Sequence, residues 1–220
     1  MREPTTPASD EAGEKQPPKV ANVPFEEAQE AQSLIASRHW DVELVFRDYL
    51  EARADGISHE DLISAMENGI ADLGTYARAR RAGATHDEIL HAHNNGYEWG
   101  LFYYADFREA GATHPEAIEA KGIVDYGELR NAGANHAEAL YVHKLAQAAD
   151  SALKIVDAYI RARKAGATHA EIVEAVDKGL DLTSYSEARE VGIDHHLALQ
   201  VHALGVLRQL IIGTRWENRS

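Results

Sequence analysis

The sequence predicts an all-α protein of tandem helical-hairpin repeats, six units of about 27 residues that stack as a short α-solenoid behind a disordered N-terminal tail. Three observations lead to this prediction. A proline-rich polar segment opens the chain, one motif recurs six times, and each copy places a helix stop directly before a helix start. No sustained alternation of apolar and polar residues indicates a β-strand.

Residues 1–24 form the predicted tail. The stretch is rich in Thr, Ser, Glu and Lys, and it has few apolar residues. It holds five of the six prolines of the chain: Pro4, Pro7, Pro17, Pro18 and Pro24. Such a composition cannot bury enough apolar surface to order the chain. A helical pattern begins near Phe25, so residues 25–220 are the predicted repeat domain.

Six segments align without gaps and carry Tyr, Arg, Gly and His at relative positions 1, 5, 8 and 11. They are residues 49–61 (repeat 1), 76–88 (repeat 2), 104–116 (repeat 3), 126–138 (repeat 4), 159–171 (repeat 5) and 185–197 (repeat 6). Tyr and His are ten residues apart in every copy, whereas the next Tyr follows after 12 to 23 residues. The motif is therefore a fixed junction, and the arm that connects successive junctions varies in length.

The junction has the chemistry of a helix end followed by a helix start. Glycine ends a helix at low cost because it tolerates a left-handed conformation. Two residues later stands a predicted N-cap: Ser58, Thr85, Thr113, Asn135, Thr168 or Asp194. Three residues after the cap stands Asp61, Glu88, Glu116, Glu138 or Glu171, or Leu197 in the last copy. The acidic residues predict capping boxes, and apolar residues directly before the cap and four after it predict hydrophobic staples. Each repeat is thus a helix A, which ends at the glycine, and a helix B, which starts at the cap.

The connecting arms contain further signals. Asp72, Asp125 and Asp181 each follow a glycine and one or two apolar residues, so we expect them to cap the next helix A. Residues 136–165 contain neither Gly nor Pro. Either Asp150-Ser151 starts a new helix there, which we favour, or helix B and the next helix A fuse into one helix.

The organisation is similar to that of tetratricopeptide repeats, which are also two-helix units stacked in an arc. Those units are longer, at about 34 residues, and their Trp-x-x-Leu-Gly signature is absent from this sequence. The resemblance implies an interaction scaffold.

Composition excludes several classes of function. The 220 residues include 22 Lys and Arg against 36 Asp and Glu, a formal net charge of −14, which argues against nucleic acid and anionic membranes as partners. The absence of cysteine excludes disulfides and thiolate zinc sites. No apolar run approaches the ~18 residues of a membrane span, and the first residues lack the apolar core of a secretory signal. We therefore expect a cytoplasmic protein, and the excess of Arg over Lys favours a bacterial or phage origin.

Histidines occupy two repeated positions. Each junction histidine directly follows a cap, and successive junctions are about 10 Å apart, too far for two imidazoles to share a zinc ion. We expect these rings to cover the turn or to bond a carbonyl group. His93, His143 and His202 lie eight residues after a cap, either in the core or in a pH-sensitive packing surface. Protonation of all 12 histidines would move the net charge from −14 to −14 + 12 = −2, so acidification is expected to promote self-association.

The Tyr and Arg of each junction share one helix face because they are four residues apart. We expect the Tyr ring to be buried with its hydroxyl in water, and the Arg to bridge to the capping Glu of a neighbouring repeat. The alternative is an Arg ladder that receives an acidic or phosphorylated partner.

Aromatic residues are concentrated between positions 97 and 107. Such clusters dominate interaction hot spots, although this one could equally be the widest part of the core. The candidate partner-binding residues are His93, Tyr97, Trp99, Phe102, Tyr103 and Phe107.

No catalytic, phosphate-binding, cofactor-binding or metal-binding motif is present in the sequence. A helix-turn-helix interpretation is disfavoured because the helices after the turn are acidic. The predicted function is a non-catalytic scaffold that binds a protein or peptide, or itself, without cofactor or metal. The alternative is a small-molecule or metal-responsive regulator, or an enzyme, with a His and aromatic pocket around residues 91–107 that includes His91.

Overall fold

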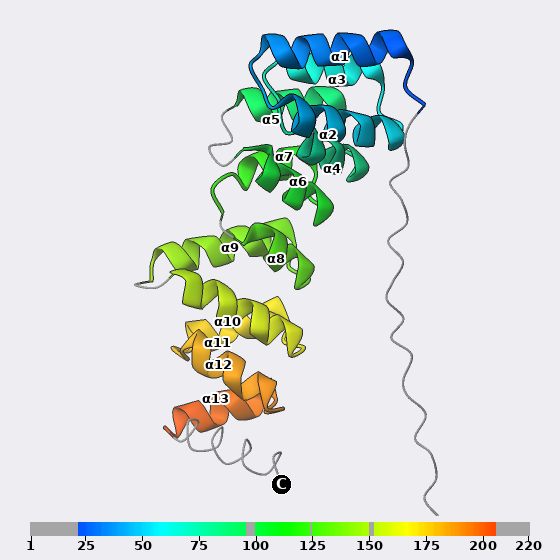
Figure 1. Ribbon diagram of the computed structural model, residues 1–220. Coiled ribbons are helices and arrows are strands. Elements are labelled where there is room, and N and C mark those ends of the chain that lie inside the picture. Colours follow the sequence, from blue (N-terminus) through cyan, green and yellow to red (C-terminus); the bar gives the residue numbers. More distant parts are fainter. Residues whose placement is uncertain (1–21, 96–99, 124, 150–151, 206–220) are drawn as a thin grey trace, which may run out of the picture. The chain divides into compact units, whose positions relative to one another are not determined.

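The protein is all-α, as predicted, in a computed structural model that describes residues 22–95, 100–123, 125–149 and 152–205. Thirteen helices and no strands are present in these residues (Figure 1). The helices are α1 (Phe25–Ser37), α2 (Val42–Ala54), α3 (His59–Glu67), α4 (Leu73–Arg81), α5 (His86–Asn94), α6 (Leu101–Glu109), α7 (His114–Glu119), α8 (Tyr126–Asn131), α9 (His136–Gln147), α10 (Ala152–Lys164), α11 (His169–Asp177), α12 (Leu182–Glu190) and α13 (His195–Ala203). After α1, even-numbered helices are the A helices of the repeats and odd-numbered helices are the B helices.

The chain divides into two compact units, residues 1–77 and 78–220, and the boundary falls inside α4. In the first unit α1 packs against α2 and α3. In the second unit the A helices pack in chain order, α6 against α8, α8 against α10 and α10 against α12 (Figure 1). Among the B helices, α9 packs against α8 and α10, α11 packs against α10 and α12, and α7 packs against α6. The helices therefore bury their apolar faces against neighbouring repeats, as a tandem-repeat fold requires.

The junction glycines end the A helices in the predicted way. Gly83 and Gly166 have φ angles of +85° and +86°, which a residue with a Cβ atom adopts only with strain. The N–H of Gly166 donates to the carbonyl of Arg163 at 2.9 Å, and that of Ala167 donates to the carbonyl of Ala162 at 3.0 Å. This pair of bonds is the Schellman motif, which satisfies the last carbonyl groups of a helix.

The six predicted caps stand at the N-caps of the six B helices. Each cap side chain accepts a hydrogen bond from the backbone N–H three residues later. The reciprocal capping box is complete at Thr85, Thr113, Asn135 and Thr168. The residues before the caps and four after them are buried in all six repeats, as the staple spacing predicts.

One predicted cap in the connecting arms is wrong. Asp72 and Asp181 accept hydrogen bonds from the N–H groups of Thr75 and Ser184, both at 2.9 Å. Asp125 makes no side-chain cap bond, and its φ of +62° departs from the extended backbone that an N-cap needs. The arm before Tyr126 is the shortest of the five, and α8 begins at this tyrosine, whereas α4, α6 and α12 begin three residues before theirs.

Residues 136–165 form two helices, because α9 ends at Gln147 and α10 begins at Ala152. The alternative of one fused helix is therefore wrong, and the proposed cap at Asp150-Ser151 lies outside the described residues. Helix α1 begins at Phe25, where the helical pattern was expected to begin. Residues 1–21 of the predicted tail also lie outside the described part.

None of the helices in the described ranges has the length and apolar character that a membrane crossing requires.

Candidate functional site

The tyrosine and the histidine of a junction are bonded to each other. In repeats 1, 3, 4, 5 and 6 the Tyr hydroxyl lies 2.8 to 3.1 Å from the Nδ1 atom of the His ten residues later. All six junction tyrosines are fully buried, and burial raises the pKa of Tyr49, Tyr104, Tyr159 and Tyr185 to about 12. The hydroxyl is therefore a neutral partner for the imidazole. In these five repeats the alternative of a bond from the ring to a carbonyl group is therefore wrong, and so is the expectation that the hydroxyl faces water, because the hydroxyl and the imidazole bond each other.

The other nitrogen of the junction histidine faces the preceding B helix, or α1 in the case of repeat 1. The Nε2 atoms of His59, His136 and His195 lie 3.2, 3.1 and 3.2 Å from carboxylate oxygens. The carboxylates belong to Glu30, Glu119 and Glu174, and each stands six residues after the N-cap of its helix. A hydroxyl that donates to Nδ1 and an Nε2–H that donates to Glu together satisfy a neutral imidazole. The histidines thus link each of these repeats to the helix before it.

The junction histidines of repeats 3 and 5 have other partners than a carboxylate. In repeat 5 the ring of His169 meets the ring of Tyr141 edge-on, with centroids 5.3 Å apart. In repeat 3 the partner is a second imidazole, since the Nε2 atom of His114 lies 3.0 Å from the Nδ1 atom of His91. The residue six positions after the cap therefore sets the chemistry of the histidine contacts made by repeats 3 to 6.

The junction arginines are also used between repeats. Arg108, Arg130 and Arg163 donate to the carbonyl groups of Gly83, Gly111 and Gly133 in the preceding repeat, at 3.0, 3.2 and 2.6 Å. Two of them also meet the capping Glu of that repeat as predicted, Arg108 with Glu88 at 3.7 Å and Arg163 with Glu138 at 3.3 Å. These side chains are 10% and 16% exposed, so the contacts favour a structural role over an open ladder for an anionic partner.

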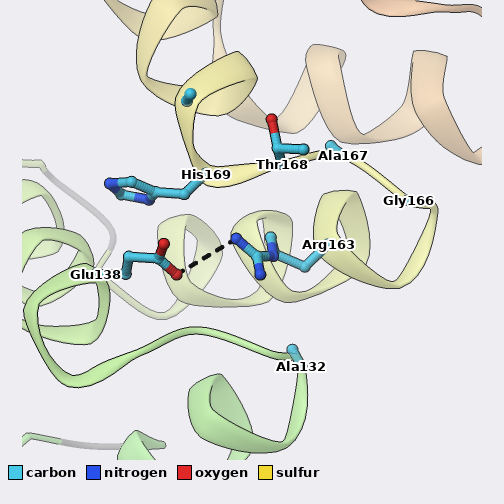
Figure 2. A pocket seen from close by; sticks show the side chains of 8 residues that line it. Ala132, Glu138, Arg163, Gly166, Ala167, Thr168 and His169 are labelled. Carbon is cyan, nitrogen blue, oxygen red and sulfur yellow. Dashed lines mark hydrogen bonds and ion pairs between the residues drawn. The ribbon is translucent and has the colours of Figure 1, made fainter.

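A shallow groove of about 560 Å³ lies over the junction between repeats 4 and 5. Figure 2 shows the ion pair of Arg163 and Glu138 in this groove, with Thr168 and His169 on one side of the pair and Ala132 on the other. The polar groups of the lining bond within the protein, Thr168 to Glu171 and His169 to Tyr159. A second groove, of about 520 Å³, lies beside Trp40 and Leu44 in the first unit. Neither groove contains a residue from the predicted region 91–107.

The candidate partner-binding residues differ in how exposed they are in the structure. Phe102 is 50% exposed and Tyr103 is 37% exposed on the outer face of α6. Phe107 is 3% exposed and packs against the ring of Tyr126 with centroids 4.7 Å apart. Its ring also lies 6.4 Å from the ring of Tyr103, one turn earlier on α6. Phe107 is therefore part of the core beneath the exposed rings, and its burial contradicts its assignment to a partner-binding surface. His93 is half-buried on α5. Tyr97 and Trp99 lie outside the described residues.

Phe102, Tyr103 and Arg78 form an exposed cluster that we name the aromatic patch. The rings of Phe102 and Tyr103 meet edge-on with centroids 5.6 Å apart, and the Arg78 guanidinium lies 5.0 Å from the centre of the Phe102 ring. Asp106 and Glu109 on α6 hold Arg78 through ion pairs. The hydrogen bond from Arg78 lowers the pKa of Glu109, which keeps this carboxylate charged. The patch is thus a fixed arrangement of two rings and a cation.

Repeat 3 differs from the other repeats at these two positions, directly before the junction tyrosine. The corresponding residue pairs are Arg47-Asp48, Gly74-Thr75, Asp157-Ala158 and Thr183-Ser184, with Val124-Asp125 in repeat 4. The aromatic pair is therefore specific to repeat 3.

Comparisons of the chain with protein-family models, with curated proteins and with solved structures found no match.

Proposed function

We propose that the protein is a non-catalytic scaffold that binds another polypeptide, or a second copy of itself, through the aromatic patch on α6. One contrast carries the proposal. The residues that recur in every repeat bond to one another within the stack, whereas Phe102 and Tyr103 are exposed and occur in one repeat only. Large aromatic side chains that are exposed and that do not belong to the repeated motif are candidates for binding a partner.

The chemistry of the patch supports a polypeptide partner. Tyr, Trp and Arg are the residue types that most often dominate protein interfaces. A guanidinium held over an aromatic ring contributes about 0.5–1 kcal/mol at an exposed site, so the arrangement is partly ordered before a partner arrives. Order in the free protein lowers the entropic cost of association.

Photo-crosslinking through position 102 tests the proposal directly. A benzophenone amino acid replaces Phe102 in the full chain, and a matched variant carries it at Thr183, the same register position in repeat 6. In extract of the native host we expect a discrete adduct from position 102 and none from position 183. An adduct of twice the chain mass would identify self-association. Equal adducts at both positions, or none at either, would contradict the proposal.

The identified partner then permits a quantitative test. We expect Phe102→Ala to weaken binding by at least about 30-fold, the effect of a hot-spot residue worth 2 kcal/mol. The thermal midpoint of the variant should stay close to that of the wild-type chain, because the ring is half-exposed. Loss of folding together with binding would show that Phe102 is structural.

A further inference from the structure

The contact between His91 and His114 differs in kind from the corresponding contacts of the other repeats. At this position His59, His136 and His195 each meet a carboxylate, which accepts the Nε2–H of the imidazole. His114 meets another imidazole nitrogen at 3.0 Å instead. Two neutral imidazoles share at most one hydrogen bond here, without help from a carboxylate charge.

We propose that His91 of repeat 2 and His114 of repeat 3 bind a divalent transition-metal ion, such as Zn²⁺, that bridges the two repeats. Imidazole nitrogens are preferred ligands of Zn²⁺, Ni²⁺ and Cu²⁺. This site is independent of the aromatic patch, because neither histidine belongs to that patch.

The distance between the two nitrogen atoms suits a shared metal ion. Two nitrogens bound at ~2.0–2.1 Å to a tetrahedral zinc ion are roughly 3.4 Å apart. The observed separation of 3.0 Å therefore has to widen by only a few tenths of an ångström. Each neutral imidazole can offer a lone pair to the metal if its single proton sits on its other nitrogen, so binding requires a change of tautomer but no net loss of a proton.

The surroundings of His114 favour a neutral, oriented ligand. The hydroxyl of Tyr104 lies 2.8 Å from Nδ1 of His114 and fixes the plane of the ring, as partners behind metal-bound histidines usually do. Burial lowers the pKa of His114, and the nearby His91 and Arg108 lower it further against the opposing effect of Glu88. The neutral form, which is the form that binds metal, therefore predominates at neutral pH.

His91 is exposed, so a metal ion can reach the pair from solvent. Within the described ranges no group of three or more His, Asp or Glu side chains could hold a metal ion. Two protein ligands with water in the remaining positions define an exchangeable site, not a structural zinc centre.

Calorimetric titration of the untagged full chain with ZnCl₂ near neutral pH tests the site. The wild-type chain should bind one equivalent at the pair, and His91→Gln should abolish this equivalent. His93→Gln is the matched control, because His93 lies on the same helix but outside the pair, and it should bind zinc like the wild type. An equal loss in both variants, or no zinc bound by the wild type at millimolar concentration, would overturn the proposal.

A variant that gains a histidine pair provides a test that does not depend on loss of zinc binding, which unfolding of a variant could also cause. Glu119→His places a second imidazole opposite His136, at the position that His91 occupies opposite His114. We expect this variant to bind a second equivalent of zinc and to melt at a higher temperature with zinc than without it. Unchanged stoichiometry in a folded Glu119→His chain would show that paired histidines at this position do not suffice.

Discussion

The junctions and the outer face of α6 differ in how their residues vary between repeats and in what those residues contact. Tyr, Arg, Gly and His recur in all six junctions. The Tyr rings are fully buried, and the Arg and His side chains make contacts within or between repeats. Phe102 and Tyr103 on the outer face of α6 occur once, and both are exposed. Repetition in this chain therefore marks residues that the stack requires, and departure from repetition marks candidates for binding.

The same distinction applies within the junctions. The position six residues after the cap holds different residues in different copies: Ser64, His91, Glu119, Tyr141, Glu174 and Gln200. His91, Glu119 and Glu174 meet the Nε2 atom of the next junction histidine, and the ring of Tyr141 packs edge-on against that of His169. The backbone places this position opposite the next junction histidine, so the residue type found there decides which kind of contact joins the two repeats.

The largest expected effect is the difference in free energy of unfolding between a substitution in a junction and one on the exposed face of α6. Tyr159→Ala removes a fully buried ring and the hydroxyl partner of His169, and should lower the free energy of unfolding by about 3–5 kcal/mol. Phe102→Ala on the exposed face should cost less than about 1 kcal/mol. Chemical denaturation of the two variants measures the difference, and similar losses would contradict the assignment of Phe102 to a surface.

Alanine substitutions at Gly166 and Gly74 are expected to change the free energy of unfolding by different, intermediate amounts. Gly166 has a φ of +86° and no atom within 4 Å of an added Cβ, so Gly166→Ala should destabilise by about 1–2 kcal/mol through backbone strain alone. Gly74 lies in helix α4, where an added Cβ would make ordinary contacts with Asp72 and Asp48 at 3.6 and 3.7 Å. Gly74→Ala should be neutral or slightly stabilising, because alanine favours a helix. Thermal unfolding of both variants checks the contrast, and an equal cost would show that chain conformation is not the cause.

The smallest expected effect concerns the pH dependence of the histidine contacts. The pKa of His114 is lowered, so the unfolded chain takes up its proton at a higher pH than the folded chain does. The stability that this histidine contributes is therefore complete above about pH 6.5, the ordinary histidine value, and is lost as the pH falls through the lowered pKa. His91→Glu supplies a carboxylate in place of an imidazole and should reduce this loss on acidification.

Denaturation curves near neutral pH and near pH 5 measure that effect. The reverse substitution, Glu119→His, should make the loss of stability on acidification larger at the contact between repeats 3 and 4. Identical pH profiles for the wild type and both variants would contradict the role of these contacts.

Local signals in the sequence predicted much of the fold. The glycine stop, the cap and the box residue act within a few positions of one another, so their spacing alone identified the ends of the helices. Asp125 failed as a cap because the short arm before Tyr126 sets its backbone, which its residue type does not reveal. Phe107 was predicted to be exposed with Phe102 and Tyr103 because a cluster of aromatics in sequence does not show how deeply each ring is buried. Phe107 and Tyr103 lie one turn apart on α6, yet only Phe107 is in the core.

The sequence alone determined the repeat, the helix boundaries at the junctions and the burial of the junction tyrosines, because these follow from local hydrogen bonding and apolar spacing. The tertiary structure decided which side chain meets each histidine, since the partner comes from the previous repeat at a distance of 17 to 29 residues along the chain. It also decided which rings are left on the surface. Both depend on how neighbouring helices pack, and packing brings together residues whose separation in sequence varies with the length of each connecting arm.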